Sequence, residues 1–120
     1  NAPAAYLSIS RKGKIISCNN MITQILGYEV AELIGKPIIE LYADNDMGKP
    51  RAKIIIEKLL KGKSTVNEEL QMLKKDGTPN WINLRTFIRR EPLPKRLQKA
   101  LSEPLKKISS GFTLESIPKC

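Results

Sequence analysis

The alternation of apolar and polar positions near the start of the chain predicts a β-hairpin. Residues 5–10 alternate Leu7 and Ile9 with more polar neighbours, and residues 14–18 form a second short run rich in β-branched side chains. Gly13 lies between the two runs and tolerates the positive φ that a tight turn requires. The two runs are therefore expected to pair as antiparallel strands.

Helical spacing replaces this alternation from residue 19 onward. We expect Asn19 and Asn20 to be N-caps of a short helix that ends at Gly27, because their side-chain oxygens can accept hydrogen bonds from free helical amides. A second short helical segment covers residues 29–34, whereas residues 38–42 fit a strand or a helix equally well. Short helices of this kind predict a chain that folds back repeatedly over one surface.

A longer helix follows and ends at Gly62. Pro50 suits its first turn, and its apolar face is expected to contain Ile54, Ile55 and Leu59.

The final part of this pattern predicts a long hairpin. Residues 64–73 are extended, and the Lys-Lys-Asp-Gly sequence of residues 74–77 is typical of a hairpin turn. The expected faces are Val66, Leu70 and Met72 on one parity of the first strand, then Trp81 and Phe87 opposite Ile82, Leu84 and Ile88 on the return strand. Strands at both ends with helices between them predict an α+β fold with an antiparallel sheet.

Composition limits the class of protein. The 120 residues are 41% hydrophobic and 28% charged, which fits one globular domain, and no apolar run is long enough to span a bilayer. Nothing at the start has the features of a signal peptide, and we treat residues 1–4 as a leader or cloning remnant.

The absence of histidine removes several chemistries. A histidine general base, a His-ligated haem and the Ser–His–Asp or Cys–His catalytic arrangements are excluded. No glycine-rich phosphate loop is present, so we expect no enzymatic activity. Cys18 and Cys120 are too few for a four-thiolate metal site or a disulfide framework. We therefore expect no metal site and a reducing compartment, the cytoplasm.

The net charge of +9 is concentrated toward the end of the chain. Residues 1–87 contain 13 basic and 9 acidic residues, whereas residues 88–120 contain 8 and 3. A basic tail can bind nucleic acid or anionic lipid, but a charge run is more often a solvated face.

Several short motifs follow one another in a fixed order over residues 5–89. They are Gly13-x-Ile15, Asn19 followed by Gly27-Tyr28, Glu32-Leu-Ile-Gly-Lys36, the acidic Asp44 and Asp46, Leu60-x-Gly62, and residues 74–77 leading to Trp81-Ile82. No single motif is specific to one family, but their ordered spacing resembles that of a PAS domain, the small sensor module of signalling proteins.

This resemblance implies a PAS-like antiparallel β-sheet with short helices packed on one face, enclosing a pocket or a packed core. It also implies a sensory and protein-interaction module from a signal-transduction protein such as a sensor kinase or a cyclic-dinucleotide enzyme. Such a module would work by ligand- or partner-dependent conformational change, would form a homodimer, and would act on an output signalling domain elsewhere in the protein.

Two departures from the family pattern stand out. Ser10 occupies a position where the family often has Asp, so a turn-capping carboxylate is missing. The last strand does not follow the long hairpin directly, because residues 90–120 form an atypical basic tail. This tail has a helical stripe interrupted by Pro104, and then an extended run at 111–117. The stripe, which we expect to mediate interaction, consists of Leu93, Leu97, Leu101, Leu105 and Ile108.

Three explanations of this tail stay open. The run at 111–117 could supply the last strand after a helical insertion, a partner chain could close an incomplete sheet, or the native end could have been replaced.

The interior suggested by the resemblance would be almost wholly apolar. Its expected lining is Ile9, Ile22, Leu26, Leu33, Leu41, Tyr42, Ile55, Leu59, Leu70, Met72, Ile82 and Leu84. These residues would serve equally as plain packing, and a lining of this kind fits an empty core or a small apolar ligand. As candidate ligand contacts we name Tyr42, Ile55, Leu59, Met72, Ile82 and Asn83, with the cofactor unknown.

Other candidate groups favour simpler interpretations. Light-sensing members of the family carry their reactive cysteine in a helical motif that is missing here, so a cysteinyl-flavin adduct is disfavoured and Cys18 is expected to be a small buried residue. Asp44 and Asp46 lack the further ligands of a calcium loop. Trp81 and Arg85 share one strand face, and Arg85 would hold an acidic ligand only if that face is the inner one.

The second function considered is a nucleic-acid- or anionic-membrane-binding protein that acts through the basic tail. Nucleic acid is disfavoured as a partner, because the tail lacks interleaved aromatic residues and any recognition motif.

Overall fold

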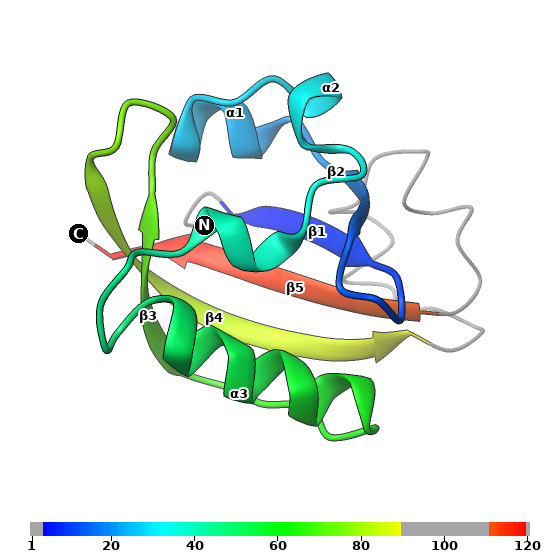
Figure 1. Ribbon diagram of the computed structural model, residues 1–120. Coiled ribbons are helices and arrows are strands. Elements are labelled where there is room, and N and C mark those ends of the chain that lie inside the picture. The colour runs from blue at the N-terminus through cyan, green and yellow to red at the C-terminus, as the bar shows by residue number, and fades with distance from the viewer. Residues whose placement is uncertain (1–3, 90–110, 120) are drawn as a thin grey trace.

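Five antiparallel strands form one sheet, and the helices lie on one side of it (Figure 1). The structure is a computed structural model that describes residues 4–89 and 111–119. The strand order is β2-β1-β5-β4-β3. In chain order the elements are β1 (Ala5–Ile9), β2 (Ile15–Cys18), α1 (Met21–Leu26), α2 (Val30–Leu33), the 3-10 helix η1 (Ile38–Leu41), α3 (Lys49–Leu60), β3 (Glu68–Leu73), β4 (Pro79–Arg89) and β5 (Gly111–Pro118).

The turn between β1 and β2 is capped by the hydroxyl of Ser10, at the position where the family often has an Asp carboxylate. The Oγ atom of Ser10 accepts hydrogen bonds from the backbone amides of Lys12 and Lys14, each at 3.2 Å. Gly13 has a φ of +76°, and its amide donates to the Ser10 carbonyl at 2.9 Å. The predicted hairpin is confirmed, and Ser10 takes over the capping role for which we expected no group.

Asn19 fastens α1 to the first strand. Its Oδ1 atom accepts a hydrogen bond from the Tyr6 amide at 3.0 Å, and its Nδ2 atom donates to the Ala4 carbonyl at 3.2 Å. Asn20 occupies the N-cap position, as predicted, but its side chain makes no capping bond. The expectation that Asn19 caps the helix is wrong, because its side chain is bonded to Tyr6 and Ala4. The helix ends as predicted at Gly27, where φ is +83°.

The ambiguous run at 38–42 becomes η1, and α3 follows it. In α3 the buried face is Ala52, Ile55, Ile56 and Leu59. This is the i, i+3, i+4, i+7 spacing of one helix face. The expectation for Ile54 was wrong, because its position turns it away from the sheet and leaves its side chain 56% exposed.

Val66 also departs from the expected pattern. It is an exposed residue, whereas Leu70 and Met72 are fully buried. Asn67 has a φ of +55°, which breaks the extended run, and β3 starts only at Glu68. The alternation expected from Val66 therefore does not continue into the strand.

The segment between α2 and α3 forms backbone hydrogen bonds with one residue of each edge strand. Along β2, the Ile15 amide donates to the Lys36 carbonyl at 2.9 Å and the Gly35 amide donates to the Ile15 carbonyl at 2.7 Å. Along β3, the Ala43 amide donates to the Gln71 carbonyl at 3.0 Å and the Gln71 amide donates to the Met47 carbonyl at 2.8 Å. These bonds occupy backbone groups that edge strands otherwise expose.

The last strand comes from the tail and lies in the middle of the sheet. β5 pairs with β1 on one side and with β4 on the other, so that Leu114 lies opposite both Leu7 and Thr86. Of the three explanations for the tail, this is the first, in which the run at 111–117 supplies the last strand. A domain that ended at residue 89 would lack this strand, so the domain extends to Pro118. The predicted leucine stripe, residues 93–108, lies outside the described residues.

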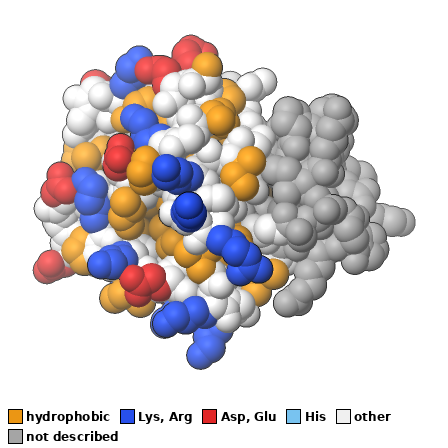
Figure 2. All heavy atoms as spheres, turned by 45° about the vertical axis from the view of Figure 1, so that its right-hand side comes forward, with side chains coloured by type: hydrophobic (Ala, Val, Ile, Leu, Met, Phe, Trp, Pro, Cys, Tyr) orange, Lys and Arg blue, Asp and Glu red, His pale blue; other side chains and the backbone are white. Residues whose placement is uncertain are grey.

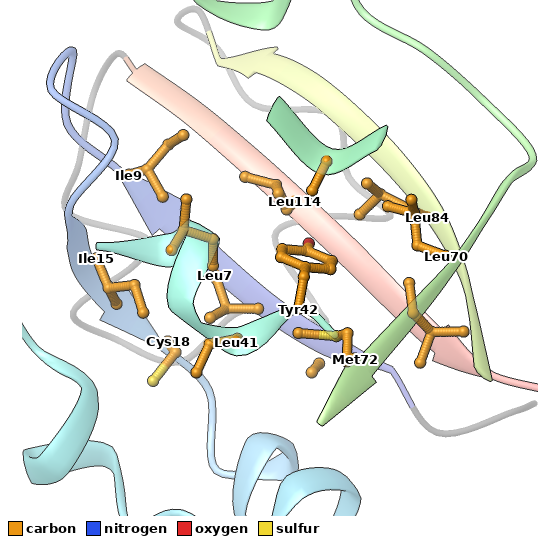
Figure 3. Close-up of a cluster of buried hydrophobic side chains, with 14 of the residues drawn as sticks. Leu7, Ile9, Ile15, Cys18, Leu41, Tyr42, Leu70, Met72, Leu84 and Leu114 are labelled. Carbon is orange, nitrogen blue, oxygen red and sulfur yellow. The ribbon is translucent and has the colours of Figure 1, made fainter. Parts of the chain in front are cut away.

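The hydrophobic core fills the space between the sheet and the helices. All twelve residues expected to line the interior are buried there. Figure 3 shows Leu7, Leu114 and Leu84 projecting from neighbouring strands toward Tyr42 and Leu41. The sheet and the helical layer are thus joined by one continuous apolar cluster.

Gly48, which precedes α3, is required by close packing of the backbone. Its amide donates to the Asn45 carbonyl at 2.9 Å, and the next amide donates to the Ala43 carbonyl at 2.7 Å. A Cβ atom on Gly48 would lie 1.9 Å from the Ala43 carbonyl oxygen. We expect Gly48→Ala to lower the free energy of unfolding by more than about 2 kcal/mol, measured by urea denaturation.

Gly62→Ala is the matched control. Gly62 has a φ of +95°, but a Cβ atom added to it would meet no other atom within 4 Å, so only the backbone penalty of about 1 kcal/mol applies. A smaller loss for Gly48→Ala than for Gly62→Ala would contradict the proposed collision.

Ser10→Asp should strengthen the first turn. A carboxylate can accept the same two amides through charge-assisted bonds, and Arg11, Lys12 and Lys14 surround it with positive charge. We expect a gain of about 0.5–1 kcal/mol in urea denaturation, decreasing with added salt. Ser10→Ala should lower the free energy of unfolding by about 1 kcal/mol. An Asp variant that is less stable than the Ala variant would contradict the capping role of this side chain.

Candidate functional site

Five of the six predicted ligand contacts lie together on the helix side of the sheet. Tyr42, Ile55, Leu59, Met72 and Ile82 are all buried members of the core cluster. They come from the end of η1, α3, β3 and β4, which the fold stacks on one another.

Asn83 is not placed with the other five. Its neighbours Ile82 and Leu84 are fully buried on the helix side, and successive side chains of a strand point to opposite faces. Asn83 therefore lies on the outer face of the sheet, opposite Glu69 of β3. It cannot line the same interior.

Tyr42 brings a polar atom into the middle of the core. Its residue is 0% exposed, and its hydroxyl has no hydrogen-bond partner among the residues that the structure describes. The backbone holds it firmly, because its amide donates to the Ile39 carbonyl at 3.2 Å and it forms an isolated β-bridge with Met72. Burial raises the pKa of the Tyr42 hydroxyl above its ordinary value, so the group is neutral and can both donate and accept.

A second unsatisfied hydroxyl, that of Ser116, was not predicted. Ser116 lies in β5 between Ala5 of β1 and Leu84 of β4, both fully buried on the helix side. Its Oγ atom also lacks a partner within the described part of the chain. The sequence contained one indication of it: Ser116 follows Phe112 and Leu114 at intervals of two residues, which places a polar side chain on the apolar face of the strand. Buried polar groups are usually hydrogen-bonded, so each of these hydroxyls can accept a partner.

The outer face of the sheet carries different chemistry. Arg85 lies on this face, and its guanidinium carbon is 5.5 Å from the centroid of the Phe87 ring. Arg85 would have held an acidic ligand inside the domain only if its strand face were the inner one, and this face is the outer one. Trp81 is 41% exposed and lines an open cleft of ≈ 500 Å³ beside Lys119 and Glu69, which form an ion pair.

The surroundings of Cys18 and of Asp44 fit structural roles rather than chemical ones. Burial raises the pKa of the Cys18 thiol to about 11, which disfavours the reactive thiolate. Asp44 forms an ion pair with Lys49 at 2.6 Å at the entry to α3. Within residues 4–89 and 111–119, no three His, Cys, Asp or Glu side chains are grouped so as to hold a metal ion.

A family model described as PAS domain matches residues 3–92, which is most of the chain. The chain belongs to the PAS domain family. It is accordingly a sensory or signalling module in the general sense of that family. The family match ends before β5, so it leaves out the strand that completes the sheet.

The complete fold has a counterpart among solved structures. The crystal structure of the PAS domain of a protein from Colwellia psychrerythraea matches with a TM-score of 0.69 at 20% sequence identity, and the match covers 97% of this chain and 86% of that one. This likeness shows the fold and includes the tail strand. No curated protein matches the sequence. In the part of the PAS domain that the structure describes, no helix has the length and apolar character needed to cross a membrane.

The buried thiol of the PAS domain makes a direct test of Cys18 possible. In a Cys120→Ser variant, Cys18 is the one remaining cysteine. We expect alkylation by iodoacetamide near neutral pH to be about 100-fold slower than that of a free thiol, because the raised pKa removes thiolate. Mass spectrometry after timed quenching measures the rate, and guanidinium unfolding should restore it. Rapid labelling of the folded variant would contradict the burial argument.

Proposed function

We propose that this PAS domain is the sensory and protein-interaction module of a larger cytoplasmic signalling protein, of the sensor-kinase or cyclic-dinucleotide-enzyme type. In this proposal the domain performs no catalysis, and its output domain lies elsewhere in the protein. The observation that carries the proposal is the hydroxyl of Tyr42, wholly buried and, among the described residues, without a partner in an apolar interior.

The ligand we propose is a small, mainly apolar molecule that carries one or two hydrogen-bonding groups. The Tyr42 and Ser116 hydroxyls lose their water on folding and gain no partner from the described residues in exchange. Leaving a buried polar group unsatisfied costs about 1–3 kcal/mol, and a ligand that bonds to it removes this cost. The surrounding Leu, Ile and Met side chains favour an apolar body for the same molecule.

Signalling in this proposal is a shift between two packings of the domain. A ligand that binds one packing better raises its population by the difference in affinity. β5 is suited to transmit such a shift, because Leu114 contributes to the core while the strand itself pairs with both β1 and β4. Homodimerisation, through the leucine stripe at 93–108 or through the outer sheet face, would carry the change between subunits.

Binding of nucleic acid or of an anionic membrane through the basic tail stays a separate prediction. It concerns residues 90–120, of which residues 90–110 and 120 lie outside the described residues. A salt-dependent gel shift and pelleting with anionic liposomes test it directly.

Native mass spectrometry of the purified chain tests the proposed ligand and the dimer together. We expect a dimer that retains a small molecule, seen as a mass excess that disappears on denaturation. Tyr42→Phe should lose this molecule while the free energy of unfolding of the ligand-free protein stays unchanged or rises by about 1 kcal/mol, because an unsatisfied hydroxyl has been removed.

Tyr28→Phe is the control for loss of a phenolic hydroxyl. The Tyr28 ring lies 5.1 Å from the Lys36 ammonium and packs at the margin of the core. This variant should retain the molecule. A ligand-free monomer from the wild-type chain would contradict the proposal.

A further inference from the structure

A surface cleft lies where three parts of the chain meet, away from the candidate interior site. It is formed by the β1–β2 turn, the end of α3 and the adjoining ends of β4 and β5, and its volume is ≈ 570 Å³. None of the five buried ligand candidates lines it. Its size falls within the range of about 300–1,000 Å³ that is typical of small-molecule sites.

The floor of this cleft is apolar. Four strands and α3 each contribute one hydrophobic residue, namely Ile9, Ile16, Leu60, Ile88 and Phe112. Ile9 and Phe112 are buried, whereas Ile16 is 45% exposed and Leu60 and Ile88 are partly exposed. The apolar surface that the cleft presents to solvent therefore comes mainly from Ile16, Leu60 and Ile88.

Two cationic residues also line the cleft. Arg11 and Lys61 both line the cleft, and no acidic residue is among the described residues that do so. The guanidinium carbon of Arg11 lies 5.6 Å from the centroid of the Phe112 ring, which places the charge beside the apolar floor. In the described part of the chain, neither cation is paired with a carboxylate.

The surroundings increase the positive potential. Residues 10–14 and 57–63 together contain six Lys or Arg residues and one acidic residue, Glu57. Both segments lie on the right-hand side of Figure 1, and Figure 2, in which this side comes forward, shows Lys and Arg side chains gathered around hydrophobic ones.

Two carbonyl groups at the end of α3 are hydrogen-bonded within the chain. The Leu59 carbonyl accepts the amide of Gly62 at 2.9 Å, and the Lys58 carbonyl accepts the amide of Lys63 at 2.9 Å. These bonds satisfy acceptors that a helix end otherwise directs outward, and so reduce their repulsion of an anion.

We propose that the cleft binds an anionic amphiphile, specifically a free medium-chain fatty-acid carboxylate. Its alkyl chain lies on the apolar floor, and its carboxylate lies between Arg11 and Lys61. A small inorganic anion would leave the floor uncovered, and a neutral hydrophobe would leave both cations without a partner. The proposal is independent of the interior ligand, since none of Tyr42, Ile55, Leu59, Met72 and Ile82, the buried candidate ligand contacts, lines the cleft.

The experiment is a titration of the isotope-labelled full chain with sodium decanoate, below its micelle concentration, followed by two-dimensional amide NMR. We expect saturable shifts at the amides of Arg11, Lys61, Gly62 and Phe112, with Tyr42 unchanged. Acetate and decanol, which each supply half of the ligand chemistry, should produce no saturable shift at the same concentrations.

Variants separate the charge and the apolar contributions. Arg11→Gln combined with Lys61→Gln should weaken decanoate binding about tenfold, the magnitude that two partly exposed charge contacts supply together. Lys53→Gln with Lys74→Gln removes the same net charge from exposed positions outside the cleft and should bind as the wild type does. Ile16→Thr, which keeps a β-branched residue at an exposed strand position, should also weaken binding.

Four outcomes would overturn the proposal: no saturable shift, equal affinity in the Arg11 and Lys61 double variant, association with anionic vesicles but not with free decanoate, or shifts centred on Tyr42 and Met72. The last outcome would instead support a ligand in the interior. Failure of the cleft and failure of the interior site are thus distinguishable in one set of spectra.

Discussion

The pairing of β5 with both β1 and β4 is the constraint on which the rest of the domain depends. β1 otherwise pairs only with β2, and β4 otherwise pairs only with β3, so without β5 the two hairpins of the described chain would not belong to one sheet. Leu114 of this strand lies between Leu7 and Thr86 and supports the core above it. The helical layer therefore packs on a sheet surface that forms only when β5 pairs with β1 and β4.

Local signals predicted most of the elements but not the way in which the sheet closes. Gly13 lies in a turn and Gly27 ends a helix, and both have a positive φ. Glycine adopts a positive φ readily, so the sequence alone predicts these two positions. The pairing of β5 spans a gap of more than twenty residues from β4, and no local pattern specifies such a contact. The partners of Asn19 illustrate the same limit, because Tyr6 and Ala4 lie 13 and 15 residues earlier in the sequence.

Errors within the candidate site have simpler physical causes. Asn83 alternates with Ile82 and Leu84, so strand geometry alone places it outside the interior. Ile54 and Ile56 are chemically identical, and the choice between them depends on how α3 is rotated against the sheet. Tyr42 was among the candidate ligand contacts named from the sequence. The parity of Ser116 with Phe112 and Leu114 places its hydroxyl in the core only once β5 is known to join this sheet.

The hydrogen bonds made by residues 35–47 along β2 and β3 have a consequence for how this domain meets other proteins. Ile15 and Gln71 already have backbone partners from within the same chain, so an extended peptide cannot easily extend the sheet at these positions. Recognition by β-augmentation is thereby disfavoured, and so is the edge-to-edge stacking that leads to aggregation. A partner would therefore contact exposed side chains of the domain, rather than the backbone of Ile15 or Gln71.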